Sequence, residues 1–226
     1  MGPAAGRRVR RVQRPGLILA ATTLHLVRHA AHGLLGRALA GRMPGVGLSA
    51  EGLAQAAALA GALAGRPIRA VLSSPVQRAQ ETAAPIAARH GLPVLTDPGL
   101  DEIDFGAWTG AEFGVLDGDP AWDAWNRFRG FAPTPGGETM AAAQARALGA
   151  VARARAAVPD GEAVLAGHSD VLKAVLAHFL GTPLDLLHRI ELAPASRSVL
   201  VLWDDGARVD GINLPAPSLS GDLCTR

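Results

Sequence analysis

Two arginines and two histidines that could bind and process an anion follow short apolar runs in this sequence. Arg28 and His29 follow the run 23–27, Arg78 follows the run 70–73, and His168 follows the run 163–166. Runs of this kind are typical of short buried strands. Ligands of open α/β sheets bind beyond the carboxyl ends of the strands. The sequence therefore predicts that these four side chains meet at one anion site.

Phosphoryl transfer is the chemistry that these residue types suit. The non-bridging oxygens of a phosphate dianion need positive charge from several directions, and the guanidinium groups of Arg28 and Arg78 offer forks of donors. A neutral ring nitrogen of His29 can attack phosphorus, which divides a difficult hydrolysis into two steps through a phosphohistidine. His168, preferably protonated, can bind the oxygens and neutralise charge in the transition state.

The departing alkoxide also needs a proton, which a carboxylic acid of raised pKa can supply. Glu102, just before an aromatic-rich segment, is the best-placed candidate, and Asp101 and Asp104 are its alternatives. The glycine-rich segment 31–47 reads as a long loop beside a strand end, where binding residues are often found. Three residues of this loop could contact a substrate: His32, Arg37 and Arg42.

The elements that must position these residues alternate between strand and helix. Apolar patterning predicts strands at 23–27, 70–73, 94–96 and 163–166, helices at 50–64, 75–90, 138–158 and 171–180, and a final hairpin of strands 198–203 and 207–212. This order is typical of the α/β class with a mostly parallel sheet. Ser74, Pro75 and Gln77 predict a capped start for the second helix, so that Arg78 and the free N–H groups of its first turn face the same anion.

The segment 103–137 holds three of the four Trp and four of the five Phe residues of the chain. One interpretation is a satellite hydrophobic cluster under a long connection. The other is a small cap that shapes a pocket for the organic part of a substrate, with Trp108 as a candidate contact. The two interpretations are compatible, and we expect a cap with its own cluster.

Composition limits the classes of protein to consider. The 226 residues carry a net charge of +2, but five arginines lie in the first 14 residues; without them 17 Lys and Arg face 20 Asp and Glu, a balance of −3. We therefore expect no nucleic-acid partner. Residues 1–16 read as a disordered basic tail and 17–226 as a single domain. The apolar run at 17–21 is too short for a signal peptide and no stretch suits a membrane span, so the cytoplasm is the expected compartment.

Several other chemistries lack their motifs. The lone Cys224 excludes an internal disulfide and a cysteine-based metal site, no metal-ligand spacing is found, and no cofactor is expected. The stretch Gly167-His168-Ser169-Asp170 begins like a serine-hydrolase elbow, but Val171 stands where that motif requires glycine. The loop 33–47 lacks the Gly-Lys-Ser/Thr ending of a nucleotide-binding P-loop.

Five motifs together resemble the histidine phosphatase superfamily, the phosphoglycerate-mutase-like fold. They are Leu-Val-Arg28-His29-Ala, Ser73-Ser74-Pro75-Val-Gln-Arg78-Ala-Gln-Glu-Thr82-Ala, Glu102-Ile-Asp-Phe105-Gly106-Ala-Trp108-Thr-Gly110, Pro135-Gly136-Gly137-Glu138-Thr and Gly167-His168-Ser169. They stand in the family's order and span about residues 23–213. The resemblance implies a three-layer α/β/α sandwich, His29 as the phosphorylated nucleophile, and Glu102 as proton donor and acceptor. It also implies Arg28, Arg78 and His168 in the phosphate pocket, and no metal.

The sequence departs from the family pattern in the first and last motifs. The family usually continues Arg-His-Gly-Glu/Gln-Thr, with an Asn three positions later that helps to bind phosphate; here Ala30, Ala31 and His32 follow, and Leu35 stands in place of the Asn. His32, Arg37 or Arg42 could substitute for it. Ser169 replaces the usual glycine; we expect it to contact phosphate, and it could also cap the next helix.

The expected activity is hydrolysis of a small phosphorylated metabolite. The longer insertion of cofactor-dependent mutases, with its aromatic-Gly-x-Leu-x-Gly-x-Asn-Lys stretch, has no counterpart here, so water is the expected acceptor. Two alternatives are a cofactor-dependent phosphomutase and, because of the departures between Ala30 and Leu35, a non-catalytic phospholigand-binding protein.

Overall fold

The structure, a computed structural model, describes residues 21–216. Its strands form one sheet in the order β3-β2-β4-β1-β5-β6. Strands β3, β2, β4 and β1 are parallel, whereas β5 runs antiparallel to β1 and β6. The strands are β1 (Thr22–Arg28), β2 (Ile68–Ser73), β3 (Val94–Thr96), β4 (Glu162–Gly167), β5 (Arg197–Trp203) and β6 (Gly206–Leu214). The predicted α/β class with a mostly parallel sheet is confirmed.

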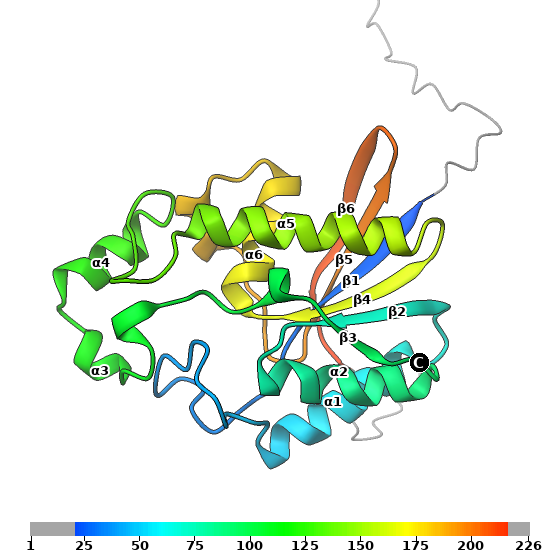
Figure 1. Cartoon of the computed structure of the whole chain (residues 1–226), viewed down its shortest axis with the longest axis horizontal. Helices are drawn as coiled ribbons and strands as arrows, with labels where there is room; N and C mark the ends of the chain where they lie inside the picture. The colour runs from blue at the N-terminus through cyan, green and yellow to red at the C-terminus, as the bar shows by residue number, and fades with distance from the viewer. Residues whose placement is uncertain (1–20, 217–226) are drawn as a thin grey trace, which may run out of the picture.

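Helices cover both faces of the sheet and make three layers (Figure 1). They are α1 (Ala50–Leu63) and α2 (Gln77–Arg89) on one face, and α5 (Met140–Ala157) and α6 (Ser169–Leu180) on the other. Successive residues of a strand point to opposite faces. Val164 of β4 accordingly packs with Leu59 of α1, while Leu165 packs in the cluster that contains Met140 of α5. Burial on both sides explains why the central parallel strands β1, β2 and β4 are largely apolar.

The strand register brings the ends of the three central parallel strands to one level. Arg28, the last residue of β1, is paired with Gly167, the last residue of β4. Ser73, the last residue of β2, is paired with Ala166. The residues that follow these strands therefore leave the sheet side by side, as the apolar runs predicted.

Three helix starts differ from the predictions; one of them is that of α6, which begins at Ser169 and not at Val171. Helix α2 begins at Gln77 and its N-cap, Val76, makes no side-chain capping bond, so the predicted capping box is wrong. The hydroxyl of Ser74 accepts from the N–H of Val76, but it is also engaged with a residue of another strand end, described below. Helix α5 begins at Met140, with Thr139 as its N-cap, two residues later than predicted.

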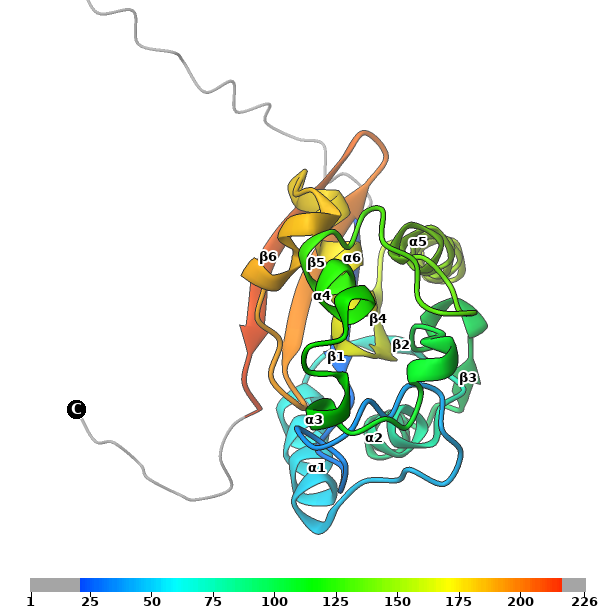
Figure 2. The ribbon, with the colours of Figure 1, turned by 90° about the vertical axis from the view of Figure 1, so that its left-hand side faces the viewer.

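The segment 103–137 is a cap of short helices with its own aromatic cluster. Its elements are a 3₁₀ turn (Gly106–Trp108), α3 (Phe113–Leu116) and α4 (Pro120–Arg127), and further 3₁₀ turns lie at Pro98–Leu100 and Leu184–Arg189. Figure 2 shows α3 and α4 in front of the sheet, between the two helical layers. Trp108 stacks edge-on with Trp122 and with Trp125, whose side chain is fully buried.

Two predictions concern residues that the structure does not describe, and a third concerns membrane-spanning segments. The basic tail 1–16 and Cys224 lie outside the described residues. Between residues 21 and 216, no helix has the length and apolar character that crossing a membrane requires.

Candidate active site

A cavity of about 190 Å³ lies at the carboxyl edge of the parallel strands. Six of the predicted site residues line it: Arg28, His29, His32, Arg78, Glu102 and Ser169. His168 lies directly behind them, fully buried. A larger groove, about 750 Å³, lies between α5, α6 and the β5–β6 turn, but its walls are mainly apolar and contain none of these residues. The predicted convergence of distant strand ends is therefore found in the smaller cavity.

His29 is held so that one ring nitrogen is left for chemistry. Its Nδ1 lies 2.9 Å from the carbonyl oxygen of Ala30, and because a carbonyl can only accept, Nδ1 carries the hydrogen. Nε2 then carries a lone pair and has no hydrogen-bond partner among residues 21–216. Burial lowers the pKa of His29 well below that of a free imidazole, and the charge of Arg78 lowers it further. The ring is thus a neutral base, as attack on phosphorus requires.

His168 is fixed by two neighbours that define its tautomer. Its Nδ1 lies 3.2 Å from Nη2 of Arg78, which can only donate, so Nδ1 accepts. Nε2 therefore carries the hydrogen and donates it to the hydroxyl of Ser74 at 2.8 Å. Burial lowers the pKa of His168 well below its usual value, with smaller contributions from His29 and Arg78. The neutral ring is favoured here, in contrast to the protonated form that the sequence suggested, and only a phosphoryl dianion beside it would favour protonation.

The two arginines present unused donors at the cavity. Arg78 is almost completely buried, and its Nη2 donates to the carbonyl of Gly41 at 2.8 Å. Its Nε and Nη1 are buried, as is Nε of Arg28, and these three nitrogens have no partner within the described part of the chain. A buried donor without an acceptor is costly in free energy. Since both side chains line the cavity, a tetrahedral oxyanion is the ligand that would satisfy them.

Glu102 has the properties of a proton donor near neutral pH. One carboxylate oxygen accepts from the N–H of Ile103 at 2.9 Å. The other lies 3.7 Å from Nη2 of Arg78 and 3.5 Å from Nδ1 of His168. Burial raises the pKa of Glu102 to about 7, against the opposing attraction of Arg78, and the negative charge of Asp170 adds to the rise. A carboxyl group with this pKa can give and take a proton at neutral pH.

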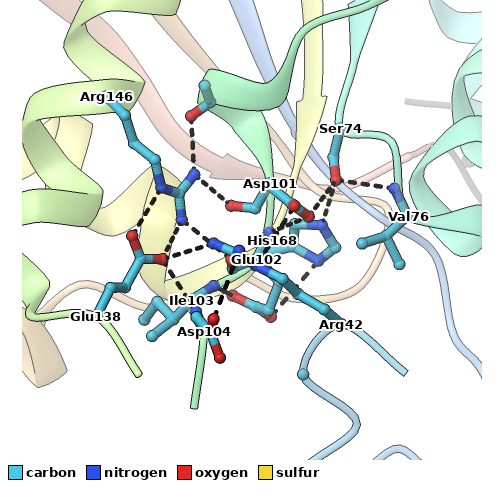
Figure 3. A network of polar contacts seen from close by, with 12 residues as sticks. Arg42, Ser74, Val76, Asp101, Glu102, Ile103, Asp104, Glu138, Arg146 and His168 are labelled. Atoms are coloured by element: carbon cyan, nitrogen blue, oxygen red, sulfur yellow. Dashed lines mark hydrogen bonds and ion pairs between the residues drawn. The ribbon is translucent and has the colours of Figure 1, made fainter. Parts of the chain in front are cut away.

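The loop that carries Glu102 is held in place by three charged residues, which we call the brace: Arg146 of α5, Glu138 and Arg42 (Figure 3). Arg146 donates to the carbonyl oxygens of Gly99, Asp101 and Glu102 at 2.7–3.0 Å. It also makes a two-bond contact with Glu138, at 2.6 and 3.0 Å. No motif in the sequence indicates a role for Arg146, because nothing along the chain links a helix residue to a loop 44 positions away.

Glu138, in the segment just before α5, also contacts the loop directly. Its carboxylate accepts from the N–H of Asp104 at 3.0 Å, and its own N–H donates to the carbonyl of Asp104 at 2.9 Å. Any Cβ on the preceding Gly137 would stand 2.0 Å from that same carbonyl, so only glycine permits the approach. The Gly-Gly-Glu motif was the sequence signal for this contact.

The remaining candidates for substrate contact lie elsewhere. Arg37 is exposed and does not line the cavity. Arg42 donates to the carbonyl of Glu102 at 2.7 Å and pairs with Glu138 at 2.9 Å, so it belongs to the brace. Trp108 packs in the aromatic cluster; Phe105 and Phe113 are the aromatic residues that reach the cavity.

Three of the positions that depart from the family pattern line the cavity: His32, Leu35 and Ser169. The His32 ring lies 5.2 Å from that of His29. Burial lowers the pKa of His32 to about 4, with Arg78 and Arg28 adding to the effect, so this ring is neutral. Ser169 is the first residue of α6, and His168 is its N-cap. The predicted capping by Ser169 is therefore wrong, but its place at a helix N-terminus suits contact with an anion.

The alternatives to Glu102 are turned away from the cavity. Asp101 accepts from the N–H of Glu102 at 2.8 Å and pairs with Arg42 at 3.3 Å. Asp104 is half-exposed and caps the N–H of Gly106. Within residues 21–216, no group of three or more His, Cys, Asp or Glu side chains is arranged to hold a metal ion.

Comparison with known proteins finds relatives of this chain in Mycobacterium tuberculosis. The uncharacterized protein Rv0525 of Mycobacterium tuberculosis is 47% identical over 151 residues, which span 65% of this chain and 73% of the relative. The glucosyl-3-phosphoglycerate phosphatase of the same organism is 34% identical over 146 residues, 60% of this chain and 65% of the relative.

Solved structures extend the similarity to nearly the whole described fold. The native structure of mycobacterial glucosyl-3-phosphoglycerate phosphatase Rv2419c matches with a TM-score of 0.78 at 28% identity, covering 86% of this chain and 99% of that one. Its complex with inorganic phosphate matches with a TM-score of 0.74 at 28% identity, over 86% and 98% of the two chains. The sequence model of the histidine phosphatase superfamily (branch 1) matches residues 24–215. This chain therefore belongs to the histidine phosphatase superfamily, and its characterised relatives are phosphatases.

Proposed function

We propose that this protein is a metal-independent phosphomonoester phosphatase that acts on a small phosphorylated metabolite through a phosphohistidine on His29. One observation supports this proposal above the others. The free Nε2 of His29 belongs to a cavity whose walls also hold unpartnered guanidinium donors of Arg28 and Arg78 and the carboxyl group of Glu102. A nucleophile, an oxyanion cradle and a proton donor are the three parts that phosphoryl transfer needs.

In the first step, the lone pair of His29 Nε2 attacks phosphorus and the bond between phosphorus and the ester oxygen breaks. Glu102, protonated below a pKa of about 7, transfers its proton to the departing alkoxide. The free donors of Arg28 and Arg78 bind the non-bridging oxygens, and Nδ1 of His168 approaches them once the ring takes a proton.

In the second step, water replaces the histidine on phosphorus. Glu102 is now a carboxylate and takes a proton from the attacking water, which restores the acid for the next turnover. The bond between Nε2 and phosphorus breaks and inorganic phosphate leaves. Because the arginines already supply the positive charge, no part of this sequence calls for a metal ion.

The test is phosphate release from a panel of small phosphomonoesters, measured with EDTA present, for the wild type and for His29→Asn. The proposal expects turnover of at least one ester by the wild type and none by the variant. Full turnover by His29→Asn would contradict the mechanism. Folding of the variant is checked by circular dichroism and thermal melting.

The same panel separates the two alternatives. A phosphomutase would require a bisphosphorylated primer and would keep the phosphoryl group in an isomeric product instead of releasing it. A non-catalytic binding protein would be stabilised by inorganic phosphate yet hydrolyse none of the esters. Either result would contradict the proposed phosphatase activity.

A further inference from the structure

The part of the cavity beyond Arg28 and Arg78 contains an acidic residue that neither binds the phosphoryl group nor transfers a proton in the proposed reaction. The outer wall is formed mainly by apolar side chains of the 31–47 loop and the cap: Leu35, Leu39, Phe105 and Phe113. Asp170, the second residue of α6, lines the same cavity. With about 190 Å³ in total, the cavity holds a phosphoryl group and only a small organic portion next to it.

Asp170 is held as a carboxylate by Arg129 of the cap. Nη1 of Arg129 donates to Oδ2 of Asp170, and this neighbour, together with Lys173 and Arg28, lowers the pKa of Asp170 against the opposing effect of burial. Arg129 is itself fixed, because its guanidinium carbon lies 5.0 Å from the centre of the Trp125 ring and its Nη2 donates to Asn126. Asp170 therefore keeps its charge and its position.

One oxygen of this carboxylate is free for a ligand. Oδ1 of Asp170 accepts no hydrogen bond from any residue between 21 and 216, and the side chain is about a quarter exposed. An alcohol portion that carries an ammonium group or a hydroxyl could donate to it. A carboxylate could only meet it as a like charge, which is destabilising at short range.

The cavity offers no cation to compensate a second negative charge. Among the lining residues that the structure describes, the cations are Arg28 and Arg78, which the phosphoryl group occupies. His32 is neutral, with a pKa of about 4. Arg37 is exposed and outside the lining, and Arg42 is paired with carboxylates of the brace.

We propose that Asp170 is a specificity-determining residue that makes the protein prefer phosphomonoesters whose alcohol portion is cationic or hydroxylated, and reject those that carry a second anion. This inference rests on the proposed function, because it concerns the leaving group of the same site. Discrimination arises from repulsion of the wrong ligand as well as from attraction of the right one.

Four phosphate esters of similar length test this proposal: phosphoethanolamine, 2-hydroxyethyl phosphate, propyl phosphate and 2-phosphoglycolate, whose end groups are cationic, hydroxyl, apolar and anionic. For the wild type we expect kcat/KM for phosphoethanolamine to exceed that for 2-phosphoglycolate by about tenfold or more, the scale of one unscreened charge contact. In Asp170→Asn this ratio should fall at least about tenfold, because the unpaired Arg129 then offers a cation to the carboxylate.

The ratio is the informative quantity. Asp170 also raises the pKa of Glu102, so its replacement changes the proton donor for every ester, and that change cancels in the ratio. Asp205→Asn in the exposed β5–β6 turn removes the same formal charge far from the cavity and should leave the ratio at its wild-type value. A fall in that control equal to the fall in Asp170→Asn would overturn the proposal.

Failure of this inference can be told from failure of the proposed function. If the wild type hydrolyses none of the four esters and no other ester in a His29-dependent way, the proposed function is contradicted. If it hydrolyses 2-phosphoglycolate as well as phosphoethanolamine, with both reactions dependent on His29, the phosphatase activity stands and the role of Asp170 is rejected. An unchanged ratio in Asp170→Asn also rejects it.

Discussion

The imidazole rings of His29 and His168 lie with their centres 5.2 Å apart and their planes tilted by 56°. They come from the ends of adjacent parallel strands, 139 positions apart in the chain, and each ring has a defined tautomer. His29 donates through Nδ1 to a backbone carbonyl and keeps Nε2 free, whereas His168 donates through Nε2 to Ser74 and accepts through Nδ1 from Arg78. The hydrogen-bond partners of the two histidines thus give their rings opposite tautomers, each suited to a different task.

Replacing Glu102 by Gln should slow transfer of the phosphoryl group to His29 by about 10²- to 10⁴-fold for esters of ordinary alcohols. The loss of rate in this variant should be much smaller for p-nitrophenyl phosphate, whose leaving group departs without a proton. In the wild type, the single-turnover rate of this step should fall as the pH rises through about 7, because burial raises the pKa of Glu102 and the acid form is the active one. An unchanged pH profile in Glu102→Gln would contradict the assignment.

The raised pKa of Glu102 should also make the free energy of unfolding depend on pH. The pKa of Glu102 is raised in the folded protein, from an ordinary value near 4.5 to about 7, so the folded state binds the proton more tightly than the unfolded state does. This tighter proton binding adds up to about 3 kcal/mol to the free energy of unfolding. The contribution is fully present below pH 4.5 and is lost as the pH rises through 7. Denaturant unfolding at pH 5 and pH 8 should therefore show the wild type losing stability relative to Glu102→Gln on going to pH 8. A constant difference between the two proteins would show that the pKa is not raised.

Arg78→Lys should weaken inhibition by inorganic phosphate about 10- to 100-fold, the range of a lost charge-assisted hydrogen bond. A lysine keeps the positive charge but lacks the planar fork of N–H donors that a guanidinium group has. The native guanidinium uses Nη2 for Gly41 and His168 and keeps Nε and Nη1 for a ligand, and a single ammonium group cannot serve all of them. The inhibition constant is measured at fixed ionic strength. Equal phosphate affinity in the wild type and the variant would place Arg78 outside the binding site.

Ser74→Ala should lower kcat about tenfold, because His168 then has a buried donor without an acceptor and the ring loses its orientation. Ser73→Ala is the matched control. It removes an equally buried hydroxyl one position earlier, where Ser73 donates to the carbonyl of Ser74 and does not contact His168. The two variants are compared by kcat at equal fractions folded. A loss of the same size in both would show that the hydroxyl of Ser74 acts only through folding.

Arg146→Lys should lower kcat about 10- to 100-fold while phosphate affinity stays close to that of the wild type, because it releases the loop of Glu102 but not the cradle. A lysine can pair with Glu138 but cannot bridge three carbonyls. Arg153→Lys is the control from the same helix; Arg153 makes a two-bond contact with Asp97 and none with Glu102. A parallel loss of phosphate affinity in Arg146→Lys would mean that the brace positions more than the proton donor.

Much of this architecture could be predicted from the sequence because it is encoded locally. Apolar runs marked the strands, and the hairpin at the end of the sheet and β3 were found where they were expected. The grouping of Arg28, Arg78 and His168 followed from the rule that parallel strands end at one edge, and the registers of β1 and of β2 on β4 bring these three strand ends to one level.

The rest could not be predicted, since it depends on pairings across long stretches of sequence. Ser74 resembled a helix cap, a local role, but its hydroxyl is engaged by His168, 94 positions away. Trp108 lies in an irregular segment without a periodic pattern, so the sequence did not show which of the aromatic residues face the cavity. The contact of Arg129 with Asp170 joins the cap to α6, and no motif indicates it.

The central claim is that His29 carries the phosphoryl group, and rapid acid and base quench with a radiolabelled ester tests it most directly. His32 is the natural control, because its ring lies as close to His29 as that of His168 and lines the same cavity. The account predicts a base-stable, acid-labile phosphoenzyme in the wild type and in His32→Asn, with no label in His29→Asn. A labelled His29→Asn protein, or label that disappears only in His32→Asn, would contradict it.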